Sequence, residues 1–251
     1  MNKVKLSSLV FILLLTLISI SVQAQAPKCQ GEFVTLPTAL NATTGDDMLM
    51  GTDGDDVING LGGDDTIYGM GGDDLICGGS GNDTIYGEGG NDTINGDAGD
   101  DNINGGTGND EIDGDAGDDN INGGAGNDDI DGDSGDDIID GGFGDDVIDG
   151  DSGDDEITGN FGSDIISGDS GRDLLIGGPG DDILKGDSGR DDIFGGSGND
   201  LLIGDSSQDN LFGEDGNDVL EGGRNRDFLN GGNGIDECDG GRARDTIEEC
   251  E

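Results

Sequence analysis

A nine-residue period runs through most of this chain and constrains its fold more than any other feature. Asp recurs at every ninth position from Asp47 to Asp245 without a miss, an insertion or a deletion. Ile or Leu follows two positions after each Asp, except where Cys238 stands, and Gly opens each unit from Gly51 to Gly240. Strictly periodic units of this length are typical of solenoids, in which each unit contacts its neighbours along the chain.

The unit itself predicts a turn followed by a short strand. Its glycine-rich half favours a turn, because Gly permits positive φ and close approach of two backbones. Its second half predicts a strand with one aliphatic side chain pointing inward. The residue after the opening Gly alternates, as in Gly106, Asp115, Gly124 and Asp133, so two nine-residue units form one 18-residue coil. About eleven coils stacked at ~4.8 Å predict an all-β parallel solenoid roughly 55 Å long.

The composition opposes folding unless a ligand adds positive charge. The chain has 59 Asp plus Glu against 10 Lys plus Arg, a net charge of −49, and 55 of its 251 residues are Gly. Low hydrophobicity with such a charge is the mark of a disordered chain. Calcium binds six to eight oxygens and combines carboxylates with backbone carbonyls. If each ion lies between turns stacked two units apart, the 23 units form up to about 21 Ca²⁺ sites.

The absence of His and the charge exclude several classes of function. An H-E-x-x-H metalloprotease, a Ser-His-Asp hydrolase and a Cys-His protease all need an imidazole, and the chain has no His. A net charge of −49 repels phosphate backbones, so we expect no nucleic-acid partner. We also expect no enzymatic activity.

The N-terminal segment 1–24 differs from the rest of the chain. Lys3 and Lys5 precede an apolar run over 6–22, and small residues surround Ala24. This pattern is typical of a secretory signal peptide that is cleaved after Ala24. A membrane anchor is the alternative, because a run of about 17 residues is at the lower limit of spanning length. We predict a secreted, extracellular protein (periplasmic in a Gram-negative cell) that has no membrane span once the signal is removed.

A short segment between the signal and the repeats is expected to cover the open first coil, as the terminal repeats of solenoids require. Its apolar residues are Phe33, Val34, Leu36 and Leu40. A binding epitope is the alternative. The expected division of the chain is 1–24 as signal peptide, 25–42 as N-terminal cap and 43–251 as calcium-binding repeats with a cysteine clamp at the C-terminal end.

The unit G-G-x-G-x-D-x-U-x, in which U is a large aliphatic residue, resembles the hemolysin-type, or RTX, calcium-binding nonapeptide. The resemblance covers about 207 residues and implies a parallel β-roll whose turn carbonyls and sixth-position Asp hold Ca²⁺ between successive turns. Many members carry an enzyme or toxin domain ahead of the repeats, whereas here we expect a signal peptide and a short cap segment ahead of them. The ligands that the resemblance implies are Asp47, Asp56, Asp65, Asp74, Asp83, Asp92, Asp101, Asp110, Asp119, Asp128, Asp137, Asp146, Asp155, Asp164, Asp173, Asp182, Asp191, Asp200, Asp218 and Asp236.

Three turns near the C-terminus depart from the unit, because Ser, Asn and Ala replace the third Gly in the turns that hold Asp209, Asp227 and Asp245. We interpret guanidinium groups as neutralising these three carboxylates in place of ions. The alternative is that each Arg points to solvent beside an intact ion. The basic residues of this edge are Arg172, Arg190, Arg224, Arg226, Arg242 and Arg244.

The positions beside the inward aliphatic residue become apolar in the C-terminal half. Stacked apolar residues on a surface mark interfaces, so we expect self-association or a protein or cell-surface partner there. The alternative is cross-strand packing that only stiffens the sheet. The two columns are Ile176, Phe194 and Phe212 on one face, and Ile165, Ile183, Leu201 and Val219 on the other.

Four cysteines predict two disulfides. Export permits disulfides, and an even number of cysteines favours pairing over free thiols. A rod roughly 55 Å long permits only the pairs Cys29–Cys77 and Cys238–Cys250, because a bridge needs Cα atoms within about 6 Å. A free thiol at Cys77 is the alternative. Such cysteine-bearing ends resemble those of small secreted members of the family.

The leading hypothesis for function is a secreted, non-enzymatic calcium-binding rod that acts as a structural, matrix or adhesive element. Two alternatives stay open. One is an ice- or ligand-binding solenoid face, for which Thr107-Gly108-Asn109 is the single Thr-Gly-Asn turn. The other is the repeat portion of a protein related to a secreted enzyme or toxin.

Overall fold

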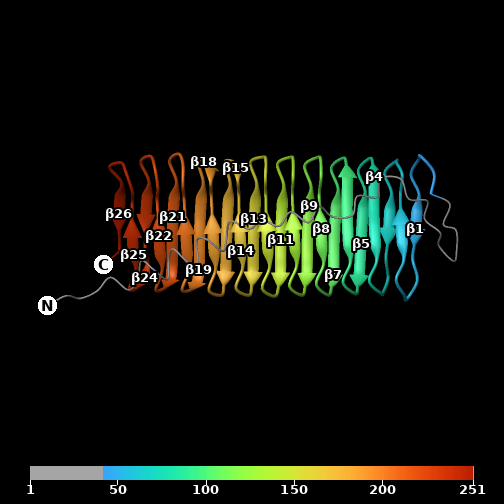
Figure 1. Cartoon of the computed structure of the whole chain (residues 1–251), viewed down its shortest axis with the longest axis horizontal. Helices are drawn as coiled ribbons and strands as arrows, with labels where there is room; N and C mark the ends of the chain where they lie inside the picture. Colours follow the sequence, from blue (N-terminus) through green and yellow to red (C-terminus); the bar gives the residue numbers. More distant parts are fainter. Residues whose placement is uncertain (1–41, 251) are drawn as a thin grey trace.

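The computed structural model describes residues 42–250, and every regular element in this range is a β-strand. Figure 1 shows the coils stacked along one long axis from β1 to β26, with strands on two faces and turns at two edges. The predicted all-β parallel solenoid is confirmed. Within the described range no helix is long and apolar enough to span a membrane.

Alternate strands form two parallel sheets, in which each strand pairs with the strand one coil away. The first sheet contains β1 (Met48–Met50), β3 (Thr66–Tyr68), β5 (Thr84–Gly89), β7 (Asn102–Thr107), β9 (Asn120–Ala125), β11 (Ile138–Phe143), β13 (Glu156–Phe161), β16 (Leu174–Pro179), β19 (Asp192–Gly198), β21 (Asn210–Gly216), β23 (Phe228–Asn230) and β26 (Thr246–Glu248), with β24 (Asn233–Gly234) beside β21. The second sheet contains β2 (Val57–Asn59), β4 (Leu75–Ser80), β6 (Thr93–Ala98), β8 (Glu111–Asp113), β10 (Asp129–Asp131), β12 (Val147–Asp149), β14 (Ile165–Ser167), β17 (Ile183–Lys185), β20 (Leu201–Ile203), β22 (Val219–Glu221) and β25 (Glu237–Asp239). A separate short pair consists of β15 (Ser170–Gly171) and β18 (Ser188–Gly189).

Equivalent positions of neighbouring coils pair with each other. In the first sheet Ile121 pairs with Ile139, and in the second sheet Ile130 pairs with Ile148. A slip of one residue would turn the aliphatic side chains outward, so the buried face specifies this register. The 18-residue coil predicted from the alternation is confirmed.

The core is a single row of aliphatic side chains between the two sheets. Twenty-one of them, from Leu49 to Leu229, are at most 3% exposed and form one cluster. Full burial of such a side chain contributes about 1.5–3 kcal/mol. Ala42, the last residue of the expected cap, packs against this cluster. The expected signal peptide and the rest of the cap lie outside the described residues.

The apolar columns of the C-terminal half are contiguous but mostly half-buried. Phe194 pairs with Phe212 in register, and their rings stack with centroids 4.8 Å apart. In the other column Ile165 is 40% exposed, while the later members are half-buried. A more exposed stack, Phe143 on Phe161 with centroids 5.0 Å apart, lies at the last residues of β11 and β13 and was not predicted from the sequence.

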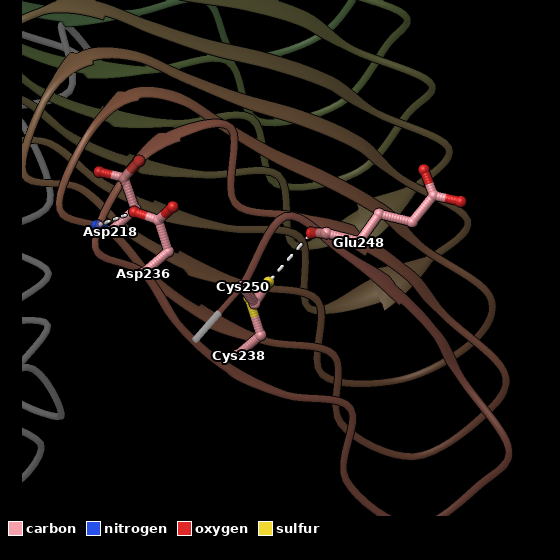
Figure 2. The surroundings of a disulfide bond; sticks show 5 residues. All are labelled: Asp218, Asp236, Cys238, Glu248 and Cys250. Carbon is pink, nitrogen blue, oxygen red and sulfur yellow. Dashed lines mark hydrogen bonds between the residues drawn. A yellow bond between two sulfur atoms is a disulfide. The ribbon is translucent and has the colours of Figure 1, made fainter.

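One of the two predicted disulfides closes the C-terminal coil. Cys238 is bonded to Cys250, with their Cα atoms 6.0 Å apart. Figure 2 shows this bridge, with Sγ of Cys250 3.2 Å from the carbonyl oxygen of Glu248. Cys77 is buried and disulfide-bonded as well, so the alternative of a free thiol there is wrong. Cys29 lies outside the described residues, and its pairing with Cys77 stays a prediction.

Candidate calcium sites

The sixth-position aspartates lie where each turn enters a strand, and the fold buries them. Twenty-one of them, from Asp56 to Asp236, are at most 5% exposed, while the terminal Asp47 and Asp245 are half-buried. They lie along two edges of the solenoid. We call the turns that enter the first sheet the first edge and those that enter the second sheet the second edge.

From Asp65 onward, each of these carboxylates links two coils through one of its oxygens. The backbone N–H of Asp119 donates to Oδ1 of Asp137, 2.7 Å away in the next coil. Figure 2 shows the same link near the C-terminal end, from Asp218 to Asp236 at 3.0 Å. All 21 pairs separated by 18 residues make this bond, with N–O distances of 2.6–3.1 Å.

The second carboxylate oxygen accepts from Thr43 in Asp47 and from Thr52 in Asp56, but beyond these two turns it has no hydrogen-bond partner among the described residues in most sites. Oδ2 is buried without a partner in 19 consecutive sixth-position aspartates, from Asp65 to Asp227. A buried polar oxygen without a partner is costly, and more so when it carries charge. The repetition of this cost in successive turns indicates that a ligand completes the site.

The opening Gly leaves room for that ligand. A Cβ at Gly114 would lie 2.7 Å from Oδ2 of Asp119 and 2.9 Å from the carbonyl oxygen of Gly132 in the next coil. A carboxylate oxygen and a backbone carbonyl oxygen therefore converge on this position, and the next nearest atom is Cδ1 of Ile121 at 3.3 Å. These are hard oxygen donors from two adjacent coils, and the set fits Ca²⁺.

Burial makes the charged form of these carboxylates unfavourable. Burial is the main cause that raises the pKa of Asp101 to about 8 and the pKa of Asp110 and Asp191 to about 7. The backbone hydrogen bond to each group lowers its pKa in part, and neighbouring carboxylates of the stack raise it further. A divalent cation at Oδ2 would favour the ionised form and oppose this shift.

Asp209 and Asp227 have the same geometry as the other sites, contrary to our interpretation of the arginine-rich turns. Their Oδ2 atoms are buried without a hydrogen-bond partner. Within residues 42–250 the arginine ion pair joins Arg172 to Asp154, at 3.6 Å, and the other ion pairs involve Lys185. The expected replacement of ions by guanidinium groups is therefore wrong at Asp209 and Asp227. The physical reason is that the arginines occupy exposed turn positions, whereas the carboxylates lie inside the coil.

The structure also brings together acidic residues whose alternation with Gly in the sequence indicated the 18-residue period. Asp115, Asp133 and Asp151 lie on the first edge, each within reach of an Asp two residues earlier at the end of a strand. The signal available in the sequence was the spacing D-G-D, which recurs at 113–115, 131–133 and 149–151.

Among the solved structures that match this chain, one is similar to it over most of its length. It is a hyperactive, Ca²⁺-dependent, β-helical antifreeze protein from an Antarctic bacterium, with 21% sequence identity and a TM-score of 0.49. The match covers 84% of this chain and 82% of that chain. No curated protein matches the chain significantly.

The family comparison covers nearly the whole repeat region. The family model of the RTX calcium-binding nonapeptide repeat, built of four copies, matches eleven segments, most of which overlap. These are residues 41–76, 78–112, 95–130, 104–139, 113–148, 131–166, 140–175, 167–202, 176–211, 203–238 and 212–247. The repeats, the parallel β-solenoid and the stacked turn carboxylates agree, and the chain belongs to the RTX calcium-binding nonapeptide repeat family.

Proposed function

We propose that this protein is secreted and non-enzymatic, and that its repeats fold outside the cell when Ca²⁺ fills the turns. The folded rod then serves as a structural, matrix or adhesive element. One observation carries the proposal: the buried Oδ2 without a partner in 19 successive aspartates, from Asp65 to Asp227. Bound Ca²⁺ supplies the positive charge that a chain with a net charge of −49 lacks.

The protein contributes the same parts at each site. Oδ2 of an Asp such as Asp119 and the carbonyl of a Gly in the next coil, here Gly132, face the space beside the opening Gly. Oδ1 of the same Asp meanwhile accepts the backbone N–H of Asp101 and so holds the preceding coil in register. The 21 inter-coil links support a capacity of up to about 21 ions along the two edges.

Calcium concentration would then decide where the chain folds. Extracellular calcium modules bind at about 10⁻⁴–10⁻³ M, far above the cytosolic level, and metal binding to such a chain is also its folding energy. The leader-like segment 1–24 would carry the chain to the calcium-rich side.

Circular dichroism of the chain without segment 1–24 tests the proposal. In excess chelator we expect the spectrum of a disordered chain, and millimolar calcium should produce a cooperative change to a strand-rich spectrum. Equal magnesium serves as the control, because Mg²⁺ dehydrates reluctantly and requires near-octahedral geometry. A strand-rich spectrum in chelator that does not change with calcium would overturn the proposal.

A pair of matched double variants locates the effect in the turns. Asp119→Asn with Asp137→Asn keeps an oxygen for the inter-coil bond but removes charge from two buried ligands. Asp118→Asn with Asp136→Asn makes the same charge change at the neighbouring exposed positions of the same turns. We expect the first variant to need several-fold more calcium to fold and the second to resemble wild type. Equal effects would show that charge in general, and not the buried site, sets calcium dependence.

The partner that we propose for the apolar column of the first sheet is a second copy of the chain. Phe194 stacks on Phe212 in register and both remain partly exposed. Light scattering in calcium should show less self-association for Phe194→Ser with Phe212→Ser than for wild type. Tyr68→Ser with Tyr86→Ser is the control, because these rings stack in the same column at the other end of the sheet. A monomeric wild-type protein would contradict this partner.

A further inference from the structure

A row of acidic side chains on the first edge is separate from the turn sites. The row is built from two positions of the unit: the last strand residue of the second sheet and the residue after the opening Gly. We call it the Asp ladder. Its members are Asp113, Asp115, Asp131, Asp133, Asp149, Asp151 and Asp169.

The members of the ladder form three successive groups of three carboxylates. Asp113, Asp115 and Asp133 form the first group, and the next two groups repeat this arrangement one and two coils further on. Within each group one oxygen of every carboxylate lies within 4.8 Å of the others. Asp133 and Asp151 each belong to two groups, so the groups form a continuous row.

The left-handed backbone of the second position brings the groups together. Asp115, Asp133, Asp151 and Asp169 all have φ between 54° and 64°. The N–H of Asp115 donates to Oδ1 of Asp113 at 3.1 Å, and the equivalent bonds recur one and two coils later at 3.3 Å. Each strand-end carboxylate is thus held against the edge carboxylate of its own coil.

The same position holds a positive charge two coils beyond the last group. Lys185 replaces the strand-end Asp there, and its Nζ contacts Oδ1 of Asp187 and lies 3.7 Å from Oδ2 of Asp205. Asp187 and Asp205 are the two edge residues that correspond to Asp115 and Asp133 in the first group. In this coil the ammonium of Lys185 is therefore the cation that lies beside the edge carboxylates. The coil between the last group and Lys185 has Ser167 at the strand-end position. Its hydroxyl donates to Oδ2 of Asp187 at 3.3 Å.

An unpartnered oxygen lies at the other end of the row. Asn95 stands one coil before Asp113 at the same strand-end position and is 1% exposed. Its Nδ2 donates to Oδ2 of Asp113 at 3.4 Å, so its amide lies against the first group. Its Oδ1 is buried without a hydrogen-bond partner. An amide oxygen of this kind is a ligand that hard cations accept.

Space and charge are also consistent with bound ions. A groove of about 500 Å³ begins at Asp151 and Asp169, the last edge residues of the row, and continues past Asp187 and Asp205 to Arg224. Burial, followed by neighbouring carboxylates, raises the pKa of Asp113 and Asp149 to about 7 and that of Asp131 to about 8. Carboxylates this close repel one another, and a bound divalent cation would offset that repulsion.

We propose that the Asp ladder is a second row of divalent-cation sites, which takes one Ca²⁺ for each of its three groups and is separate from the turn sites.

Crystals grown in calcium test the proposal on the unaltered protein. Anomalous difference maps should show a peak inside each of the three groups, at about 2.3–2.6 Å from carboxylate oxygens, besides the peaks of the turns. No peak is expected beside Lys185, whose ammonium already fills the equivalent place. Occupied turn sites with no peak in the ladder would overturn this proposal alone, whereas empty turns would overturn the proposed function as well.

A triple substitution provides an independent count. This variant combines Asp113→Lys, Asp131→Lys and Asp149→Lys. Each group then has a lysine at the strand-end position that Lys185 occupies in its own coil. Elemental analysis after gel filtration in calcium should find about three fewer Ca²⁺ per chain than in wild type, one for each group. The control carries the same charge change at strand positions outside the ladder: Glu111→Lys, Asp129→Lys and Glu156→Lys. Equal calcium content in the two variants would overturn the proposal.

Discussion

The backbone N–H of Asp128 donates to Oδ1 of Asp146, 2.9 Å away in the next coil. Asp146 in turn donates its own N–H to Asp164 at 2.9 Å, so each Asp is both donor and acceptor in a chain that runs along the edge. Because the other oxygen of the same carboxylate is the candidate calcium ligand, binding of an ion orients the group that accepts the N–H of the preceding coil. Calcium binding and coil stacking are therefore coupled, and we expect folding to be cooperative along the rod.

Protonation of the buried carboxylates should partly stabilise the fold when calcium is absent. The folded-state pKa of Asp101 is about 8 and that of Asp110 about 7, against a usual value of 3.8. When folding raises the pKa of a carboxylate, the group has no effect on stability at a pH below its pKa in the unfolded chain. It destabilises the fold increasingly as the pH rises from that value to its pKa in the folded chain. In chelator, strand content measured by circular dichroism should therefore rise as pH falls from 8 to 4.

Calcium binding should show the matching linkage. Because the ion needs the ionised form, each bound Ca²⁺ should release protons, and the calcium midpoint of folding should fall as pH rises from 5 to 8. Titration in weakly buffered solution measures the released protons directly. A calcium midpoint that is independent of pH across this range would contradict the assignment of buried carboxylates as ligands.

A methyl group at the opening Gly should interfere with the site, whereas one at an open turn position should not. In Gly114→Ala the new Cβ would lie 2.7 Å from Oδ2 of Asp119, and relief of such a contact costs about 1–3 kcal/mol. At Gly54 no atom lies within 4 Å of a Cβ, so Gly54→Ala is the control. Calcium titrations should show a higher folding midpoint for Gly114→Ala alone.

The core should respond according to burial. Ile130→Ala removes a side chain that is 1% exposed and should lower the free energy of unfolding in calcium by about 2–5 kcal/mol. Ile138→Ala, at a side chain 52% exposed, should change it by no more than about 0.5 kcal/mol. Urea unfolding in excess calcium measures both, and similar losses would argue against the observed register.

Loss of the C-terminal disulfide should act locally. Cys250→Ser opens a bridge between residues 12 apart, for which a loop of this size predicts a contribution of about 3 kcal/mol. In a solenoid each coil contacts only its neighbours, so hydrogen exchange should accelerate in β25 and β26 and stay unchanged in β9. Uniform acceleration along the chain would contradict this. Non-reducing peptide mapping of wild type should also yield the pair Cys29–Cys77.

Periodicity was enough to predict the architecture. The spacing of Ile121 and Ile139 placed them in register on one face, and the spacing of Asp119 and Asp137 placed both carboxylates on one edge. These features depend only on the length of the coil, which an 18-residue alternation specifies. The same reasoning could not show that Oδ1 is used between coils while Oδ2 is left for a ligand, because that depends on side-chain torsion.

Features that depend on the path of the turn were harder to predict. The Asp ladder forms because Asp133 has a φ of 61°, which brings its carboxylate to Asp131 instead of to solvent. The stack of Phe143 on Phe161 was missed because β11 and β13 extend into positions that the glycine-rich half of the unit had predicted as turn. The arginine interpretation failed because charge counting along an edge does not distinguish exposed from buried turn positions, as Arg190 and Asp209 illustrate.

The difference between the two edges also sets the unit in which such a rod can change length. Removal of one whole coil would leave Asp133 beneath another Asp of the ladder and Ile121 beneath another Ile. Removal of a single nonapeptide would keep the aliphatic row intact but would place Gly124 in the column of Asp115 and exchange the two edges from that point on. The core residues repeat every nine positions, whereas the edge residues on the surface repeat every eighteen. Insertions and deletions that preserve both should therefore come in whole coils, which makes the rod extendable in steps of about 4.8 Å.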